Sequence, residues 1–263
     1  MLTADRFPAR LRPPAGAPVR AVAAAGLAVS FLLLAGCGGG GGSAEATAVP
    51  SSSPTATADD FGCLSPEQAR TNSVTFPSSS GQDVAAFADG TGHTALILTH
   101  QADGDVCQWV PHAMELAKDG YRVVAVDSVG DDVAEVTAAV TWARAKGATK
   151  VLLVGASKGG TAVLEAAGSI TPPVDGVVSL SAPTSYGAMD AAPVVPRLTM
   201  PVFYMASDLD SPFADAAKEL SKSTKKAKEN DLTIVDGTNH GVSMLNDATN
   251  YTKVKDFLKK YGS

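Results

Sequence analysis

Ser157 is the residue of this sequence best placed to act as a nucleophile. It lies in Gly155-Ala156-Ser157-Lys158-Gly159, between a strand-like apolar run and a helical pattern. A sharp strand–turn–helix would expose the hydroxyl and direct the backbone N–H groups of the helix start towards it. The alternative is a glycine-rich turn that only packs tightly. A serine also needs a base to accept its proton, so a histidine must lie nearby.

His240 is the predicted base. The chain has four histidines, and His240 is the only one that follows Ser157. It lies in Gly237-Thr238-Asn239-His240-Gly241, just after the last predicted strand. Loops at the carboxyl ends of parallel strands form the sites of open α/β sheets. An ordinary surface-loop histidine is the alternative.

Asp210 is the predicted carboxylate that orients His240 and stabilises its charged form. It lies in Ser207-Asp208-Leu209-Asp210-Ser211-Pro212, between a predicted strand and a predicted helix. Asp208 is the alternative acid, and helix capping is a purely structural role for either. We expect Asp236 to shape the turn before His240.

Strand-like and helical patterns alternate through the region that contains these residues. The predicted strands are Ser73–Phe76, Asp83–Phe87, Thr94–Thr99, Arg122–Asp127, Lys150–Val154, Val174–Leu180, Pro201–Ala206 and Leu232–Val235. The predicted helices are Gln108–Lys118, Asp132–Lys146, Gly159–Ala167, Phe213–Ser223 and Ala248–Tyr261. Apolar strands alternating with helices predict a mostly parallel sheet covered on both faces. The first two strands are joined by a hairpin and predict an antiparallel edge.

The order Ser157, Asp210, His240 on these elements resembles the α/β-hydrolase superfamily over roughly residues 73–263. The layout is most similar to small esterases like dienelactone hydrolase. The resemblance implies a three-layer sandwich with about eight strands. It also implies an oxyanion hole formed by the backbone amides of Lys158 and Gln101. In this chain His100-Gln101 replaces the family's usual His-Gly, and we expect His100 to shape the loop rather than to catalyse.

The serine nucleophile implies acyl transfer, without a cofactor or a metal. The family places its lid in the interval that is residues 181–200 here, and this short stretch predicts a minimal lid over an open, shallow pocket. Tyr186, Met189 and Trp109 are candidate pocket residues, with core or surface packing as their alternative role. The leading prediction is an ester hydrolase acting, as a monomer, on a small-molecule or exposed acyl ester. The alternatives are a thioesterase or peptidase with the same triad, and a non-catalytic binding lipoprotein.

The N-terminal part of the chain predicts delivery to a membrane surface. Residues 1–36 carry arginines followed by an uncharged, mostly apolar run, which is typical of a signal peptide. Leu34-Ala35-Gly36-Cys37 resembles the lipobox of bacterial lipoproteins, in which the cysteine is lipidated; an ordinary signal peptide is the alternative. Residues 37–62 predict a flexible Gly/Ser/Thr/Pro tether, and residues 63–263 the hydrolase domain. The expected location is extracytoplasmic, on the outer face of a bacterial cell membrane.

Two cysteines remain after Cys37, namely Cys63 and Cys107. An even pair in an oxidising compartment predicts a disulfide, with two free buried thiols as the alternative. The formal net charge of −6 and the absence of a basic patch argue against a nucleic-acid partner.

Overall fold

The computed structural model describes residues 58–263. The predicted signal peptide, the predicted lipidation site Cys37 and most of the predicted tether therefore lie outside the described residues. The strands are β1 (Ser73–Pro77), β2 (Asp83–Asp89), β3 (Thr94–Thr99), β4 (Arg122–Val126), β5 (Lys150–Ala156), β6 (Gly176–Leu180), β7 (Ser185–Tyr186), β8 (Met189–Asp190), β9 (Val202–Ser207) and β10 (Asn230–Val235).

Six α-helices and three 3₁₀ turns are assigned within residues 58–263. The α-helices are α1 (Pro66–Asn72), α2 (Val110–Lys118), α3 (Asp132–Ala145), α4 (Lys158–Ala167), α5 (Phe213–Ser223) and α6 (Ala248–Gly262). The 3₁₀ turns are η1 (Val106–Gln108), η2 (Val195–Arg197) and η3 (Gly241–Asn246).

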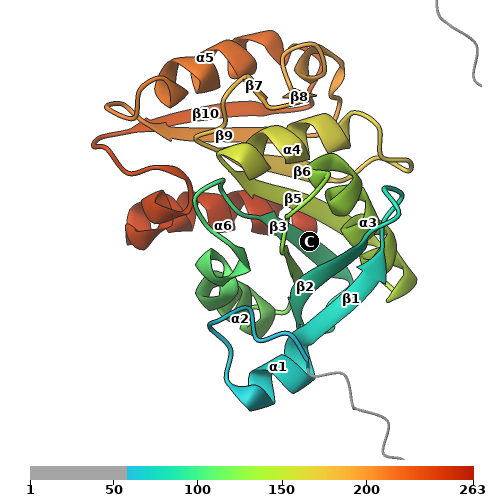
Figure 1. The fold of residues 1–263 in the computed structure, drawn as a ribbon. Coiled ribbons are helices and arrows are strands. Elements are labelled where there is room, and N and C mark those ends of the chain that lie inside the picture. The colour runs from blue at the N-terminus through green and yellow to red at the C-terminus, as the bar shows by residue number, and fades with distance from the viewer. Residues whose placement is uncertain (1–57) are drawn as a thin grey trace, which may run out of the picture. The chain divides into compact units, whose positions relative to one another are not determined.

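Eight strands form one sheet in the order β1-β2-β4-β3-β5-β6-β9-β10 (Figure 1). β1 pairs antiparallel with β2, and β2 pairs antiparallel with β4, whereas all the other pairs of this eight-stranded sheet are parallel. The predicted antiparallel edge is therefore confirmed. Because β3, β5, β9 and β10 run in the same direction, the loops that follow them meet at one edge of the sheet.

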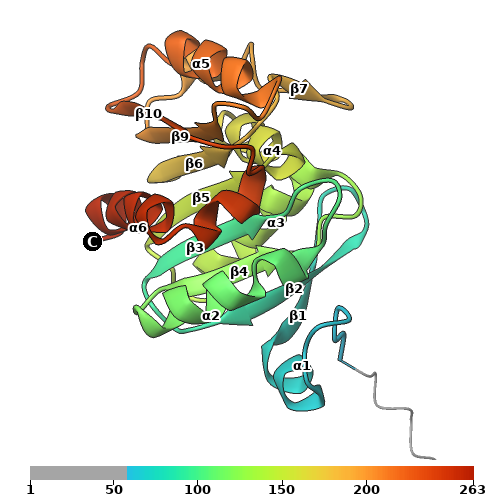
Figure 2. The same cartoon turned by 90° about the vertical axis from the view of Figure 1, so that its left-hand side faces the viewer.

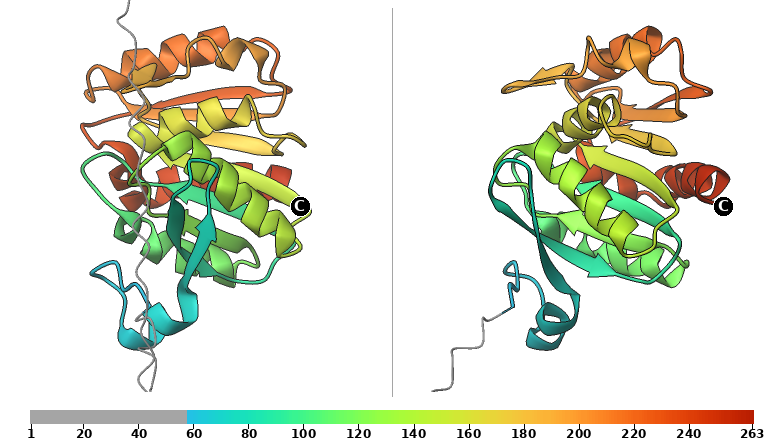
Figure 3. Two further views of the ribbon diagram at one scale, coloured as in Figure 1. Left: turned by 45° about the vertical axis from the view of Figure 1, so that its right-hand side comes forward. Right: turned by 90° about the vertical axis from the view of Figure 1, so that its right-hand side faces the viewer.

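Helices cover both faces of this sheet. Successive strand residues point to opposite faces, so Ile97 and Leu153 pack with α3 and α4, whereas Leu96 and Leu152 pack with α2 and α6. Figure 2 shows α4 and α6 on opposite sides of the sheet, and the right-hand view of Figure 3 shows the same for α3 and the red helix α6. The predicted three-layer α/β sandwich is confirmed.

Three features differ from the sequence prediction. Helix α1 was not predicted, although Ser65 and Gln68 form a capping box with Pro66 at the first helical position. The predicted helix Gln108–Lys118 is present as α2 but begins two residues later, because Gln108 ends the 3₁₀ turn η1. The predicted lid interval contains the short β7–β8 hairpin and η2 rather than a plain loop. The elements that were not predicted, namely α1, η1, η2, η3, β7 and β8, are too short to show a clear hydrophobic period.

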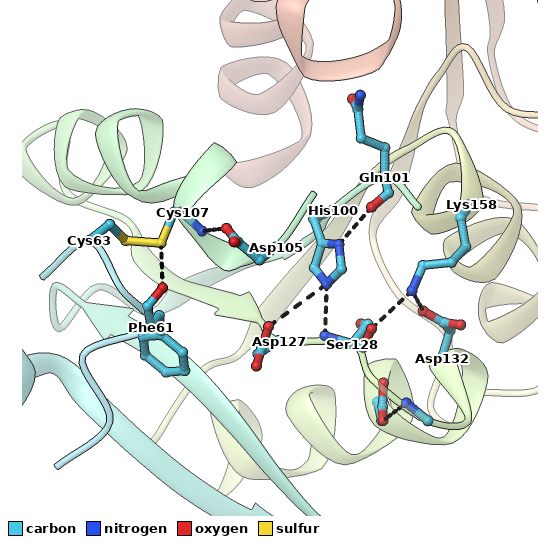
Figure 4. A network of polar contacts seen from close by, with 12 residues as sticks. Phe61, Cys63, His100, Gln101, Asp105, Cys107, Asp127, Ser128, Asp132 and Lys158 are labelled. Atoms are coloured by element: carbon cyan, nitrogen blue, oxygen red, sulfur yellow. Dashed lines mark hydrogen bonds and ion pairs between the residues drawn. A yellow bond between two sulfur atoms is a disulfide. The ribbon is translucent and has the colours of Figure 1, made fainter. Parts of the chain in front are cut away.

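A disulfide joins Cys63 to Cys107, as predicted, with their Cα atoms 6.0 Å apart. Cys63 precedes α1, and Cys107 lies in η1, between β3 and α2. The bond therefore ties the start of the described chain to the segment that follows the β3 loop (Figure 4). None of the helices within residues 58–263 combines the length and the apolar character that crossing a membrane requires.

Candidate active site

Ser157 lies between β5 and α4 in a backbone conformation that few side chains adopt. Its φ is +48° and its ψ is −114°. Such a conformation costs of order 1–3 kcal/mol in a residue other than glycine and persists only where the surroundings enforce it. Here the Ser157 N–H donates to the Leu180 carbonyl over 2.8 Å, and 7 % of the residue is exposed. The residue is thus fixed at the sheet edge with limited access to solvent.

Glycines allow the close packing of the serine turn, which comprises residues 155–159. A Cβ on Gly155 would lie 2.2 Å from the Gly159 carbonyl oxygen, and a Cβ on Gly159 would lie 2.6 Å from the Thr99 carbonyl oxygen. The Thr99 hydroxyl donates to the Gly159 carbonyl over 3.1 Å. The end of β3 therefore packs directly against the start of α4.

His240 and Asp210 form a hydrogen bond of 2.8 Å between Nδ1 and Oδ2. Asp210 is buried in the loop after β9, and the His240 side chain is 26 % exposed. A carboxylate accepts, so Nδ1 carries the proton and the lone pair of Nε2 is left free to accept another. The Phe213 ring lies 4.3 Å from the imidazole, centroid to centroid, and restricts its position.

Asp208 has a different contact. Its Oδ1 accepts from the Gly237 N–H over 2.8 Å, and the residue is exposed. Asp208 therefore joins the loop after β9 to the loop after β10. Of the two acids that the sequence left open, the one in contact with His240 is Asp210. Asp236 is exposed in the turn before His240.

The loop that carries His240 is held against the serine turn. The Gly241 N–H donates to the Ser181 hydroxyl over 3.1 Å, and a Cβ on Gly241 would lie 3.3 Å from the Cβ of Ala156. The residue after His240 thus lies beside the residue before Ser157. Within residues 58–263, no hydrogen bond joins Ser157 Oγ to the His240 ring. Bonds between a nucleophile and its base are often loose until the substrate binds.

The sequence did not predict a structural role for the side chain of Gln101. Its Oε1 accepts from the Val242 N–H over 3.2 Å, and its Nε2 donates to Asp103 over 2.8 Å. Gln101 is buried and connects the β3 loop to the segment after His240. The only sequence signal was the glutamine itself, in place of the glycine usual in the family.

The two predicted oxyanion amides lie at loop and helix starts on the same edge. Lys158 is the first residue of α4, where the backbone N–H has no partner within the helix. In the described part of the chain, the Gln101 N–H donates to no backbone acceptor, whereas the Gln101 carbonyl accepts from Gly104 N–H and from His100 Nδ1. His100 therefore shapes this loop.

The three residues that the sequence offered as pocket residues lie in two different places in the structure. Trp109 is 1 % exposed and packs in the core with α2 and α6, so it lines no pocket. Tyr186 and Met189 line a cleft of about 760 Å³ between the β7–β8 hairpin and the start of α3. Asp132 also lines this cleft. Within residues 58–263, no cluster of three or more His, Cys, Asp and Glu side chains is arranged to bind a metal ion.

The sequence matches no family model and no curated protein. In contrast, its structure is similar to solved esterase structures. An esterase from Pyrococcus furiosus has a TM-score of 0.62 at 15 % identity, with 73 % of this chain and 91 % of that chain covered. An esterase from Rhodococcus sp. has a TM-score of 0.61 at 19 % identity, with coverage of 73 % and 100 %.

The esterase domain of a Rhodothermus marinus protein has a TM-score of 0.60 at 19 % identity, with 73 % of this chain and 98 % of that chain covered. At such identities the likeness concerns the fold. The strand order, the sharp turn at Ser157 and these three likenesses agree with one another, and the chain has the α/β-hydrolase fold.

Proposed function

We propose that this protein is a serine hydrolase of carboxylic esters, with Ser157 as nucleophile, His240 as base and Asp210 as the acid that orients His240. The observation that carries the proposal is the His240–Asp210 hydrogen bond, on a loop whose Gly241 lies beside Ala156 of the serine turn. Because Nδ1 is bound to Asp210, Nε2 is the ring nitrogen able to take a proton.

In the proposed reaction, Ser157 Oγ attacks the ester carbonyl carbon and its proton passes to His240 Nε2. The carbonyl electron pair becomes an oxyanion, which the amides of Lys158 and Gln101 bind. Collapse of this intermediate expels the alcohol, which takes the proton from His240 and leaves an acyl-enzyme. Water then attacks the acyl carbon and gives one proton to His240 Nε2. Collapse of the second tetrahedral intermediate breaks the bond to Ser157 Oγ, which takes that proton from His240, and releases the carboxylic acid.

Two observations support an ester with an apolar part as the substrate. The three similar solved structures described above are named as esterases, which supports carboxylic esters over thioesters and amides. Four large apolar side chains are exposed in the described part of the chain. Three of these, namely Val129 (83 %), Leu209 (66 %) and Tyr186 (41 %), follow the carboxyl ends of β4, β9 and β6. They lie at the edge of the sheet that carries Ser157.

We further propose that the domain acts as a monomer outside the cytoplasm, attached to the membrane through lipidated Cys37. The disulfide between Cys63 and Cys107 supports an oxidising compartment, because such bonds are rare where thiols are kept reduced. The lipobox-like Leu34-Ala35-Gly36-Cys37 supports the anchor.

Hydrolysis of p-nitrophenyl esters of increasing acyl length tests the catalytic proposal. Ser157→Ala should lower kcat by a factor on the order of 10⁶, as loss of the nucleophile does in a serine protease. Ser169→Ala, an exposed serine just beyond the other end of α4, is the control and should retain full activity. Ester hydrolysis that survives in purified Ser157→Ala would contradict the proposal. Faster turnover of matched thioesters or amides would instead change the substrate class.

A further inference from the structure

The partly buried side chain of Lys158 makes two polar contacts of its own. Its Nζ lies 2.9 Å from the Ser128 carbonyl oxygen and 2.8 Å from Asp132 Oδ1, and the Lys158 and Asp132 side chains are 13 % and 10 % exposed (Figure 4). A buried ammonium group is costly unless it is paired and hydrogen-bonded. These two partners therefore fix the side chain that follows Ser157.

His100 contacts the other side of the same residue, Ser128. The Ser128 N–H donates to His100 Nε2 over 3.0 Å, so Nε2 accepts and Nδ1 carries the proton. Nδ1 then donates to the Gln101 carbonyl over 2.8 Å. His100 is 3 % exposed, and Asp127 Oδ1 lies 4.0 Å from Nε2.

Ser128 thus links the two residues that supply the proposed oxyanion amides. Its N–H reaches Gln101 through His100, and its carbonyl reaches Lys158 directly (Figure 4). Ser128 belongs to the β4–α3 loop, residues 127–131, which is itself held at its far end. There the Gly130 N–H donates to Glu135 over 2.9 Å, and Asp131 caps α3. The link through Ser128 therefore lies in a loop whose other end is fixed to α3.

We infer that Lys158 and His100 are positioning residues. Through Ser128, their side chains hold the backbone amides of Lys158 and Gln101 at a fixed position relative to each other. The inference rests on the proposed ester hydrolysis. Two donors on separate loops bind an oxyanion well only if both lie at hydrogen-bonding distance from it. Loss of one donor lowers kcat by about 10²–10³ in a serine protease. A displaced donor should cost less than a missing one.

The test variant is Lys158→Met/Asp132→Asn, which removes both charges. Lys158→Met alone would leave Asp132 buried without its partner and is a poor choice, because it can fail to fold. The matched control is Lys218→Met/Asp215→Asn, since that pair has a similar separation of 2.9 Å but is exposed. We expect the test variant to fold and to show a kcat lower by a factor on the order of 10–100, with KM within about twofold. The control should match the wild type.

His100→Leu tests the other half of the link. It should also lower kcat at constant KM. When His100→Leu is combined with the double variant, the total loss of kcat should be smaller than the product of the two separate losses, because both changes act through Ser128. The inference is overturned if the folded double variant keeps the wild-type kcat, if only KM changes, or if the two effects add fully. It is also overturned if activity returns when each variant is assayed at the same distance below its own melting temperature. A wild-type protein that hydrolyses no ester would instead overturn the proposed function, and this inference with it.

Discussion

At the scale of single residues, the contact between Asp210 and His240 decides which ring nitrogen can take a proton. Asp210 occupies Nδ1 over 2.8 Å, so that Nε2 is free for the proposed proton transfer from Ser157. The sequence placed two acids in this loop, and their separation of two residues could not distinguish them. Burial and the partner distinguish them: Asp210 is buried against His240, whereas Asp208 is exposed and accepts from Gly237.

Asp210→Asn should therefore abolish most of the activity, and Asp208→Asn should not. An amide cannot balance an imidazolium, and in a comparable triad of a different fold the same change lowers kcat by about 10⁴. Asp208→Asn weakens one exposed hydrogen bond, which contributes about 0.5–1.5 kcal/mol of stability. Turnover of a p-nitrophenyl ester measures the difference, with circular dichroism as the control for folding. If Asp208→Asn were the inactive variant, the assigned acid would be wrong.

Gln101 shows the limit of sequence reasoning at this scale. Its side chain accepts from Val242, 141 residues away in the sequence. Such a contact depends on which loops meet at the sheet edge, and no local pattern records it. The order of Ser157, Asp210 and His240 could be predicted because each follows a recognisable strand.

At the scale of elements, the first turn of α3 holds two buried carboxylates, Asp132 and Glu135, next to the β4–α3 loop that contains Ser128. Burial raises the pKa of Glu135, and the charge of Asp132 raises it further, while the Gly130 N–H and Lys158 lower it in part. The net direction is upwards, so the folded protein holds this proton more tightly than the unfolded chain does. The stability from this group is present below its ordinary value of 4.5 and is lost as the pH rises through the raised pKa.

Glu135→Gln should remove this loss of stability at higher pH. The variant keeps an oxygen that can accept from the Gly130 N–H, but it has no proton to release. Its melting temperature relative to the wild type should therefore be higher at about pH 8 than at about pH 4. Differential scanning calorimetry across this range measures the difference. A difference that is the same at every pH would mean that Glu135 does not titrate as described.

The elements of the sheet could be predicted because their apolar runs are long and alternate with helices. Short helices and two-residue strands show no clear hydrophobic period, and α1, η3 and the β7–β8 hairpin were missed. For α1 a local signal did exist, since Ser65, Pro66 and Gln68 form a capping box with proline at the first helical position. The β7–β8 hairpin has only two residues in each strand, too few for any alternation to show.

At the scale of the whole molecule, a disulfide bears on stability, and the proposed lipid on Cys37 bears on location. The Cys63–Cys107 disulfide closes a loop with a sequence separation of 44. The spacing of two cysteines cannot by itself prove a bond, but an even pair in a predicted extracytoplasmic domain made it the economical interpretation.

Cys63→Ala/Cys107→Ala should lower the free energy of unfolding by about 3–4 kcal/mol, because the open chain gains entropy when it unfolds. Urea denaturation of the wild type and the variant measures this difference, and Ellman's reagent provides the control that the wild type has no free thiols at these positions. Equal unfolding midpoints would show that the bond does not stabilise the domain.

Cys37→Ser should release the protein from the membrane fraction or leave it unprocessed, because a thioether-linked lipid cannot form on serine. Fractionation of cells expressing the wild type and the variant, with mass spectrometry of the N-terminal peptide, measures the outcome. A processed variant that still partitions with membranes would remove the proposed anchor while leaving the catalytic proposal intact.

The central claim is that Ser157 is the nucleophile, and a fluorophosphonate probe tests it most directly, because the probe forms a covalent bond with an activated serine. Intact-mass and peptide mass spectrometry should find one adduct per molecule, on the peptide that contains Ser157. Asp210→Asn should label far more slowly, and Ser157→Ala should not label at all. A wild-type protein that stays unlabelled while folded, or an adduct on any other serine, would contradict the account.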